Sequence, residues 1–135
     1  MSLLHLILSI HWITVLSLTV FSFVIGFIWH SPFLFGKTWK QENNPDSKPI
    51  KINAPLIFGG TALAHLVAIS SLSLIVSGLG GLNGFKSGFL ISIVWVLPAI
   101  LGTYLFANRS LKLLAIDAGM YIVLFSVSGF VLGIW

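Results

Sequence analysis

Four long apolar stretches, each nearly free of charged residues, fill most of this chain at residues 3–29, 54–76, 85–107 and 113–134. A helix that crosses the hydrocarbon core of a bilayer needs about 20 residues, and each stretch reaches that length. The stretches lack the strict alternation of barrel strands, which favours helices as the structures that pair every backbone group. The sequence therefore predicts an all-α fold: an integral membrane bundle of four transmembrane helices.

Composition supports one membrane domain over residues 1–135. Charged residues make up 7% of the chain and apolar residues 57%. Because a soluble domain carries about 25% charged residues, we expect no soluble domain beside the spans. The sequence has no cysteine, which excludes disulfides, thiol catalysis and thiolate metal sites.

The positions of the basic residues predict a membrane orientation. The net charge is +4, and all but one of the cations fall in the first and third connections: Lys37, Lys40, Lys48, Lys51, Arg109 and Lys112. Lys86 falls at the second connection. The positive-inside rule then places loops one (residues 30–53) and three in the cytoplasm and both termini outside. Orientation accounts for the charge, so we predict no nucleic-acid partner.

Prolines and short connections indicate where the helices end. Pro32 predicts the end of the first helix, because proline disfavours helical geometry in the residue before it. Pro55 fits the first turn of the second span, and Pro98 predicts a kink in the third. Residues 41–51 form the polar linker. The short second connection, reaching Gly84, predicts that spans two and three are antiparallel neighbours.

Small residues recur at helical spacing on spans three and four. They are Gly84 and Gly88 on the third span, and Gly119, Gly129 and Gly133 on the fourth. Small residues allow the close helix approach on which association in lipid depends. Packing within one bundle is the favoured interpretation, and a seam between copies in a homo-oligomer is the alternative.

Asp117 is the acidic residue inside an apolar stretch. It lies five residues past Lys112, roughly 7 Å inside the boundary at about 1.5 Å per residue. An aspartate at the centre of a span costs about 2.5–3.5 kcal/mol, so Asp117 should face protein or water and have a polar partner. Tyr121 follows one helical turn later. Polar residues at the same end of the other spans are candidates to converge with them: Trp29, His30, Asn53, Tyr104, Asn108 and Arg109.

Two interpretations of this polar cluster remain open. One is a cytoplasm-facing pocket that binds an ion or a small ligand. The other is a structural clasp, for example a hydrogen bond from the Trp29 indole to Asp117, because buried polar groups need partners either way.

The histidines outside this cluster are His5, His11 and His65. His65 lies near the middle of span two, where a histidine either relays protons or bonds to a neighbouring helix as a neutral group. A haem between His65 and His11 is disfavoured, because their depths differ by roughly 7 Å at about 1.5 Å per residue. No histidine pair has the spacing of metal ligands on a helix, so we predict neither a metal nor a cofactor.

Residues 29–39 read Trp-His-Ser-Pro-Phe-Leu-Phe-Gly-Lys-Thr-Trp. This run resembles the signature of small bacterial four-span proteins grouped as domain of unknown function 1761, usually Trp-Tyr-Ser-Pro, two variable positions, Phe-Gly-Lys and a nearby Trp. Residues 116–121, Ile-Asp-Ala-Gly-Met-Tyr, also resemble that family's fourth span. The resemblance covers essentially the whole chain and implies four helices in a bacterial inner membrane, with no established activity. His30 replaces the family's usual tyrosine, which disfavours it as a family-wide proton carrier.

These observations leave two leading functional hypotheses. The first is a carrier or channel for a proton, a cation or a small polar solute, with Asp117 at its centre. The second is an accessory or scaffold subunit of a larger membrane assembly, in which the small-residue stripes contact a partner membrane protein or a second copy. An enzyme is disfavoured, because the sequence has no phosphate-binding loop, no nucleophile motif and no paired carboxylates.

Overall fold

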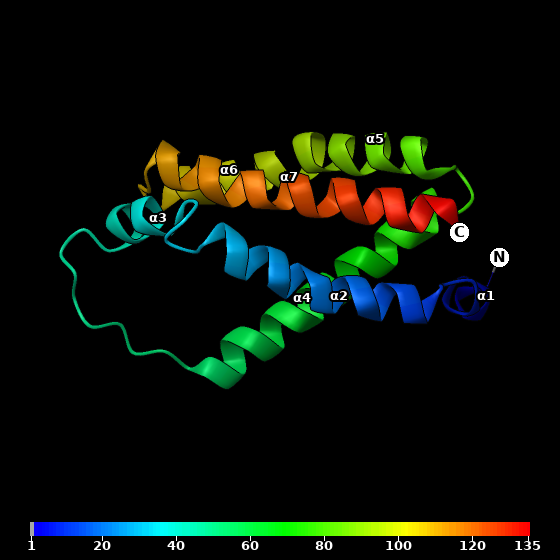
Figure 1. Cartoon of the computed structure of the whole chain (residues 1–135), viewed down its shortest axis with the longest axis horizontal. Coiled ribbons are helices and arrows are strands. Elements are labelled where there is room, and N and C mark those ends of the chain that lie inside the picture. The colour runs from blue at the N-terminus through cyan, green and yellow to red at the C-terminus, as the bar shows by residue number, and fades with distance from the viewer. Residues whose placement is uncertain (1) are drawn as a thin grey trace.

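The computed structural model describes residues 2–135 as helices joined by turns and loops, which confirms the predicted all-α fold (Figure 1). Four helices in this part of the chain are long and apolar enough to cross a membrane. They are α2 (Trp12–Trp29), α4 (Ala54–Val76), the continuous run Gly81–Phe106 and α7 (Leu111–Ile134). Two short helices, α1 (Leu3–Leu8) and α3 (Gly36–Asn43), flank α2.

The first span is shorter than predicted, because the helix breaks between α1 and α2. The Ser9 hydroxyl donates to the Leu6 carbonyl at 2.8 Å, and the Trp12 indole donates to the Ile7 carbonyl at 3.1 Å. A continuous helix would use these two carbonyls for the backbone N–H groups four residues later. Side-chain donors compete for them instead, so the single helix expected over residues 3–29 is wrong.

The third span begins at Gly81, four residues earlier than predicted, and ends at Phe106. It consists of α5 (Gly81–Ile91), the π-helical turn η1 (Ser92–Val96) and α6 (Leu97–Phe106). The Leu97 N–H donates to the Ser92 carbonyl, a π-type bond one turn before Pro98. The irregularity that Pro98 predicts is therefore a widened turn ahead of the proline, where the ring would otherwise meet a carbonyl.

Helix α7 lies at the centre of the fold and begins two residues before the predicted start, because the Ser110 hydroxyl caps the Leu113 N–H at 3.1 Å. It contacts α2, α3, α4, α5, η1 and α6. Its most extensive contact is with α5, which runs alongside it (Figure 1).

Glycines bring the backbones of α5 and α7 into direct contact. A Cβ atom added at Gly84 would lie 2.0 Å from the Gly129 carbonyl oxygen, and one at Gly133 would lie 2.7 Å from the Gly80 oxygen. One at Gly88 would lie 2.0 Å from a carbonyl oxygen of α7. Four of the five glycines singled out in the sequence thus lie at the contact between α5 and α7 of one chain.

Helix α4 crosses the other helices instead of pairing with α5. It packs mainly on α2 and α7 and has only a small contact with α5, so the expected close pairing of spans two and three is wrong. Helix α7, and not α4, packs along α5 through the glycine contact. All buried residues of α4 lie in its second half: His65, Ile69, Leu72, Ser73 and Val76. Its first two turns stand away from the bundle (Figure 1).

The two ends of the fold differ in what they carry. The first described residues and the C-terminus lie at one end, and the loop between α3 and α4 and the turn between α6 and α7 lie at the other (Figure 1). The end with α3 also holds the beginning of α7, and with it Asp117.

The α5–α7 contact predicts a large difference between two identical substitutions. Gly84→Ala should destabilise the fold by about 1–3 kcal/mol, because the added methyl group forces two backbones apart. Gly102→Ala on α6 has no atom within 4 Å of the new Cβ and should be neutral or stabilising, since alanine has the higher helix propensity. Equilibrium unfolding in mild detergent measures both, and equal stability of the two variants would contradict the packing described.

Candidate functional site

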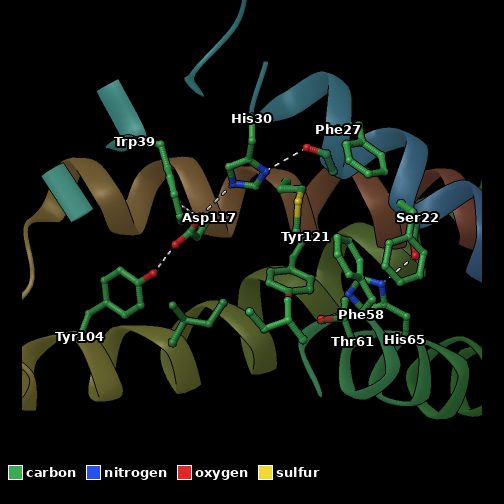
Figure 2. A pocket seen from close by; sticks show the side chains of 15 residues that line it. Ser22, Phe27, His30, Trp39, Phe58, Thr61, His65, Tyr104, Asp117 and Tyr121 are labelled. Atoms are coloured by element: carbon green, nitrogen blue, oxygen red, sulfur yellow. Dashed lines mark hydrogen bonds and ion pairs between the residues drawn. The ribbon is translucent and has the colours of Figure 1, made fainter. Parts of the chain in front are cut away.

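A cavity of about 720 Å³ lies between α2, α4, α6 and α7, with α3 at one end (Figure 2). Most of its wall is aromatic or aliphatic. Its polar lining residues are Ser22, His30, Thr61, His65, Tyr104, Asp117 and Tyr121, together with the indole of Trp39. The structure thus joins His65 and Asp117, which the sequence left as separate candidates, in one cavity.

The Asp117 carboxylate has polar neighbours on three elements, two of which are hydrogen-bond donors (Figure 2). The Tyr104 hydroxyl of α6 donates to Oδ2, and the Trp39 indole of α3 donates to Oδ1 at 3.0 Å. The Nε2 atom of His30, at the end of α2, lies 3.5 Å from Oδ1. The Asp117 side chain is 21% exposed, so the carboxylate is largely enclosed and still reachable from the cavity.

The protonation of His30 decides the nature of its contact with Asp117. His30 Nδ1 lies 2.9 Å from the Gly26 carbonyl oxygen, which can only accept, so Nδ1 carries a proton. Neutral His30 then presents the lone pair of Nε2 towards Oδ1. In that form two acceptors face each other across 3.5 Å, whereas a protonated His30 donates from Nε2 and pairs with the carboxylate.

The turn between α2 and α3 places Trp39 in the site. A Cβ atom at Gly36 would lie 2.2 Å from the His30 carbonyl oxygen, so the chain reverses tightly only with glycine there. The Gly36 N–H donates to the Ser31 carbonyl at 3.0 Å and closes the turn. Helix α3 is thereby directed back over α7. Trp39 is not among the site residues predicted from the sequence, although it ends the signature-like run.

Trp29 has a different partner from the one expected. Its indole donates to the Ile116 carbonyl at 2.8 Å and not to Asp117, so the predicted Trp29–Asp117 clasp is wrong. A Cβ atom at Gly119 would lie 3.0 Å from the Trp29 ring. Gly119 therefore makes room for Trp29 on α7 and lies apart from the glycines that contact α5.

His65 forms a second polar contact deeper in the cavity. It is 6% exposed, and its Nδ1 lies 2.7 Å from the Ser22 hydroxyl of α2. The single Ser22 proton goes to the Thr19 carbonyl at 2.6 Å, so His65 Nδ1 is the donor and Nε2 is the acceptor in the neutral ring. Tyr121 contacts His65 edge to face, with 5.9 Å between ring centroids, which links this end of the cavity to α7.

The other predicted members of the cluster do not line the cavity. Asn53 caps α4 through the Leu56 N–H, and Asn108 lies in the turn before α7 with a positive φ of 52°. Arg109 lies over the Tyr104 ring, with its guanidinium carbon 5.6 Å from the ring centroid. Among residues 2–135, no group of three or more His, Cys, Asp or Glu side chains is placed to hold a metal ion.

The fold and the site define a four-span membrane protein with one carboxylate in a largely apolar cavity. The family model described as "Protein of unknown function (DUF1761)" matches residues 13–133, and the chain belongs to this family. The resemblance seen in the sequence is thus confirmed. No curated protein and no solved structure matches the chain.

The Ser22–His65 contact predicts a measurable loss of stability on its removal. Ser22→Ala removes the hydrogen-bond partner of His65 Nδ1 and with it the bond that joins α2 to α4. The free energy of unfolding should fall by about 0.6 kcal/mol, and at most by about 1.7 kcal/mol. Ser17→Ala on the same helix is the control, because the exposed Ser17 hydroxyl bonds only to the Ile13 carbonyl of its own helix. The two unfolding free energies are compared in detergent, and a Ser22→Ala value no lower than the control's would refute an interhelical role.

Proposed function

We propose that this protein is a carrier or channel for a proton, a cation or a small polar solute, and that Asp117 is its binding group. The observation that carries the proposal is the contact between His30 Nε2 and Asp117 Oδ1 at 3.5 Å, which pairs two acceptors whenever His30 is neutral. The Gly26 carbonyl already fixes the other ring nitrogen. A proton or a cationic donor that enters between the two acceptors satisfies both.

Two further features support transport over a fixed structural role. The cavity continues from Asp117 past Tyr121 to His65, so groups able to bind a polar species follow one another from the α3 end to the middle of α4. The wall formed by the third span is irregular, since the π turn before Pro98 interrupts its helix. Such π turns inside helices are frequent at functional sites, where the widened turn alters the local packing.

The rival function is a non-catalytic accessory or scaffold subunit. The observation in its favour is that Tyr104 and Trp39 both donate to Asp117, which ties α6 and α3 to α7 as a structural clasp would. In that case the exposed first half of α4 would contact a partner membrane protein or a second copy of this chain.

We also propose a bacterial inner membrane as the location, with both termini outside and loops one and three in the cytoplasm. The charge asymmetry supports this orientation: Lys48 and Lys51 lie in the loop before α4, and Lys37 and Lys40 lie on α3. Arg109 and Lys112 flank the start of α7 at the same end. Lys86 lies on α5, towards the opposite end.

The absence of cysteine makes this orientation directly testable. Ser47→Cys places one thiol in the α3–α4 loop, and Leu79→Cys places one in the α4–α5 turn. In cells expressing each variant, an impermeant maleimide should label Leu79→Cys without lysis and Ser47→Cys only after lysis. The reverse pattern would show the opposite orientation.

The Asp117→Asn variant tests the transport proposal. The amide keeps an oxygen that accepts a hydrogen bond but removes the negative charge, so proton or cation flux should fall to the rate of protein-free vesicles. Flux into reconstituted vesicles under an imposed gradient measures the change. Asp46→Asn is the control, because Asp46 is exposed and pairs only with Lys48 at 3.0 Å. Unchanged flux in Asp117→Asn would refute the proposal. A native protein that produces no flux above protein-free vesicles would favour the accessory role.

A further inference from the structure

We infer that the ligand of the Asp117 cavity is an organic ammonium ion: a charged N–H donor attached to an apolar, ring-sized or chain-like body. The inference rests on the proposed function and names its substrate class. It follows from three properties of the cavity, namely the charge at one end, the character of the walls and the position of the opening.

The charge at the α3 end selects a cation. Asp117 is the one carboxylate among the lining residues. The cations near it lie outside the lining and have other contacts, because Arg109 covers the outer face of the Tyr104 ring and Lys112 lies 3.9 Å from Glu42. With neutral His30, the cavity carries a net negative charge in a low-dielectric setting, where a cation gains more than it would in water.

The geometry at this end selects an N–H donor over a bare metal ion. Calcium takes six to eight oxygen ligands and magnesium about six, whereas Asp117 already accepts bonds from Tyr104 and Trp39. When His30 is neutral, its Nε2 and Asp117 Oδ1 are two acceptors 3.5 Å apart on residues that line the cavity. An ammonium group donates one N–H to each of these two atoms.

The walls select an apolar body attached to that ammonium. Beyond Asp117 the cavity is lined by Phe27, Phe58, Ile100, Met120 and Tyr121, and its volume of about 720 Å³ lies in the range of sites for organic ligands. A small hydrated ion gains nothing from such walls. At the far end, the acceptor Nε2 of His65 and the Thr61 hydroxyl provide a place for a second polar group on the ligand.

The opening lies on a side that the bilayer covers. Phe27 is 68% exposed and Phe58 is 50% exposed, and both line the cavity from α2 and α4. Helices α4 and α6 line it as well, but within residues 2–135 they share no substantial contact that would close the gap between them. An amphiphilic amine dissolved among the lipids can therefore enter sideways, with its apolar body leading and its ammonium reaching Asp117 last.

The test is equilibrium binding to the full chain in lipid nanodiscs, with empty nanodiscs subtracted. The probes are 2-(1-naphthyl)ethylammonium and 2-(1-naphthyl)ethanol, which share a body and differ in charge. We expect the ammonium to bind about tenfold or more tightly than the alcohol, because charge-assisted hydrogen bonds form only with the former. Asp117→Asn should remove this preference, and Asp46→Asn should keep it.

A second pair of variants tests the walls without touching the carboxylate. Phe58→Ala should weaken binding of the ammonium probe about two- to tenfold through loss of the ring contact. Phe89→Ala is the matched control on α5, with 45% exposure and no part in the cavity, and should bind as the native chain does. Both substitutions leave the Asp117 contacts intact and replace phenylalanine side chains that are about half exposed, so folding is preserved.

The outcomes separate this inference from the transport proposal. Equal binding of the two probes, or no binding above empty nanodiscs, overturns the inference even if the native protein moves protons. Selective ammonium binding that Asp117→Asn abolishes supports the inference even if vesicles show no flux, in which case transport alone is wrong. A Phe58→Ala variant that binds as tightly as Phe89→Ala would also overturn it, because the apolar body would then lie elsewhere.

Discussion

The close contact between the backbones of α5 and α7 is the constraint from which the arrangement of the other helices follows. In lipid, apolar side chains gain little by leaving one apolar environment for another, so helices associate through fitted packing. Gly84 and Gly129 have no side chain that would hold these two helices apart. Helix α7 then turns its remaining faces to α2, α4 and α3, and α4 crosses the bundle with only a small contact to α5.

The Asp117 carboxylate organises the opposite end of α7. A charged group inside the membrane needs partners, and three elements supply them through Trp39, Tyr104 and His30. The clasp and the binding site are therefore compatible descriptions of one group. Tyr104 and Trp39 fix the carboxylate in place, and the contact with His30, which lacks a donor when the ring is neutral, leaves a position that a proton or an ammonium can fill.

The cavity exists because two walls do not pack tightly. The first half of α4 stands away from the bundle, and α6 buries none of its own residues after the π turn that precedes Pro98. Aromatic side chains line the space that remains, and they bring His65 and Asp117 into one volume. The same looseness that would be costly in water is tolerated here, since lipid covers apolar surfaces without penalty.

Length, composition and residue spacing are local properties of a chain, and they are enough to predict four apolar helices, the small-residue stripes and the unusual position of Asp117. Tertiary structure decided which groups meet. Whether Trp29 or Trp39 reaches Asp117 depends on the turn at Gly36, and whether α4 or α7 lies against α5 depends on which glycines face each other. Spacing along one helix cannot reveal these contacts, since the angle and depth at which two helices cross are set by side chains far apart in the chain.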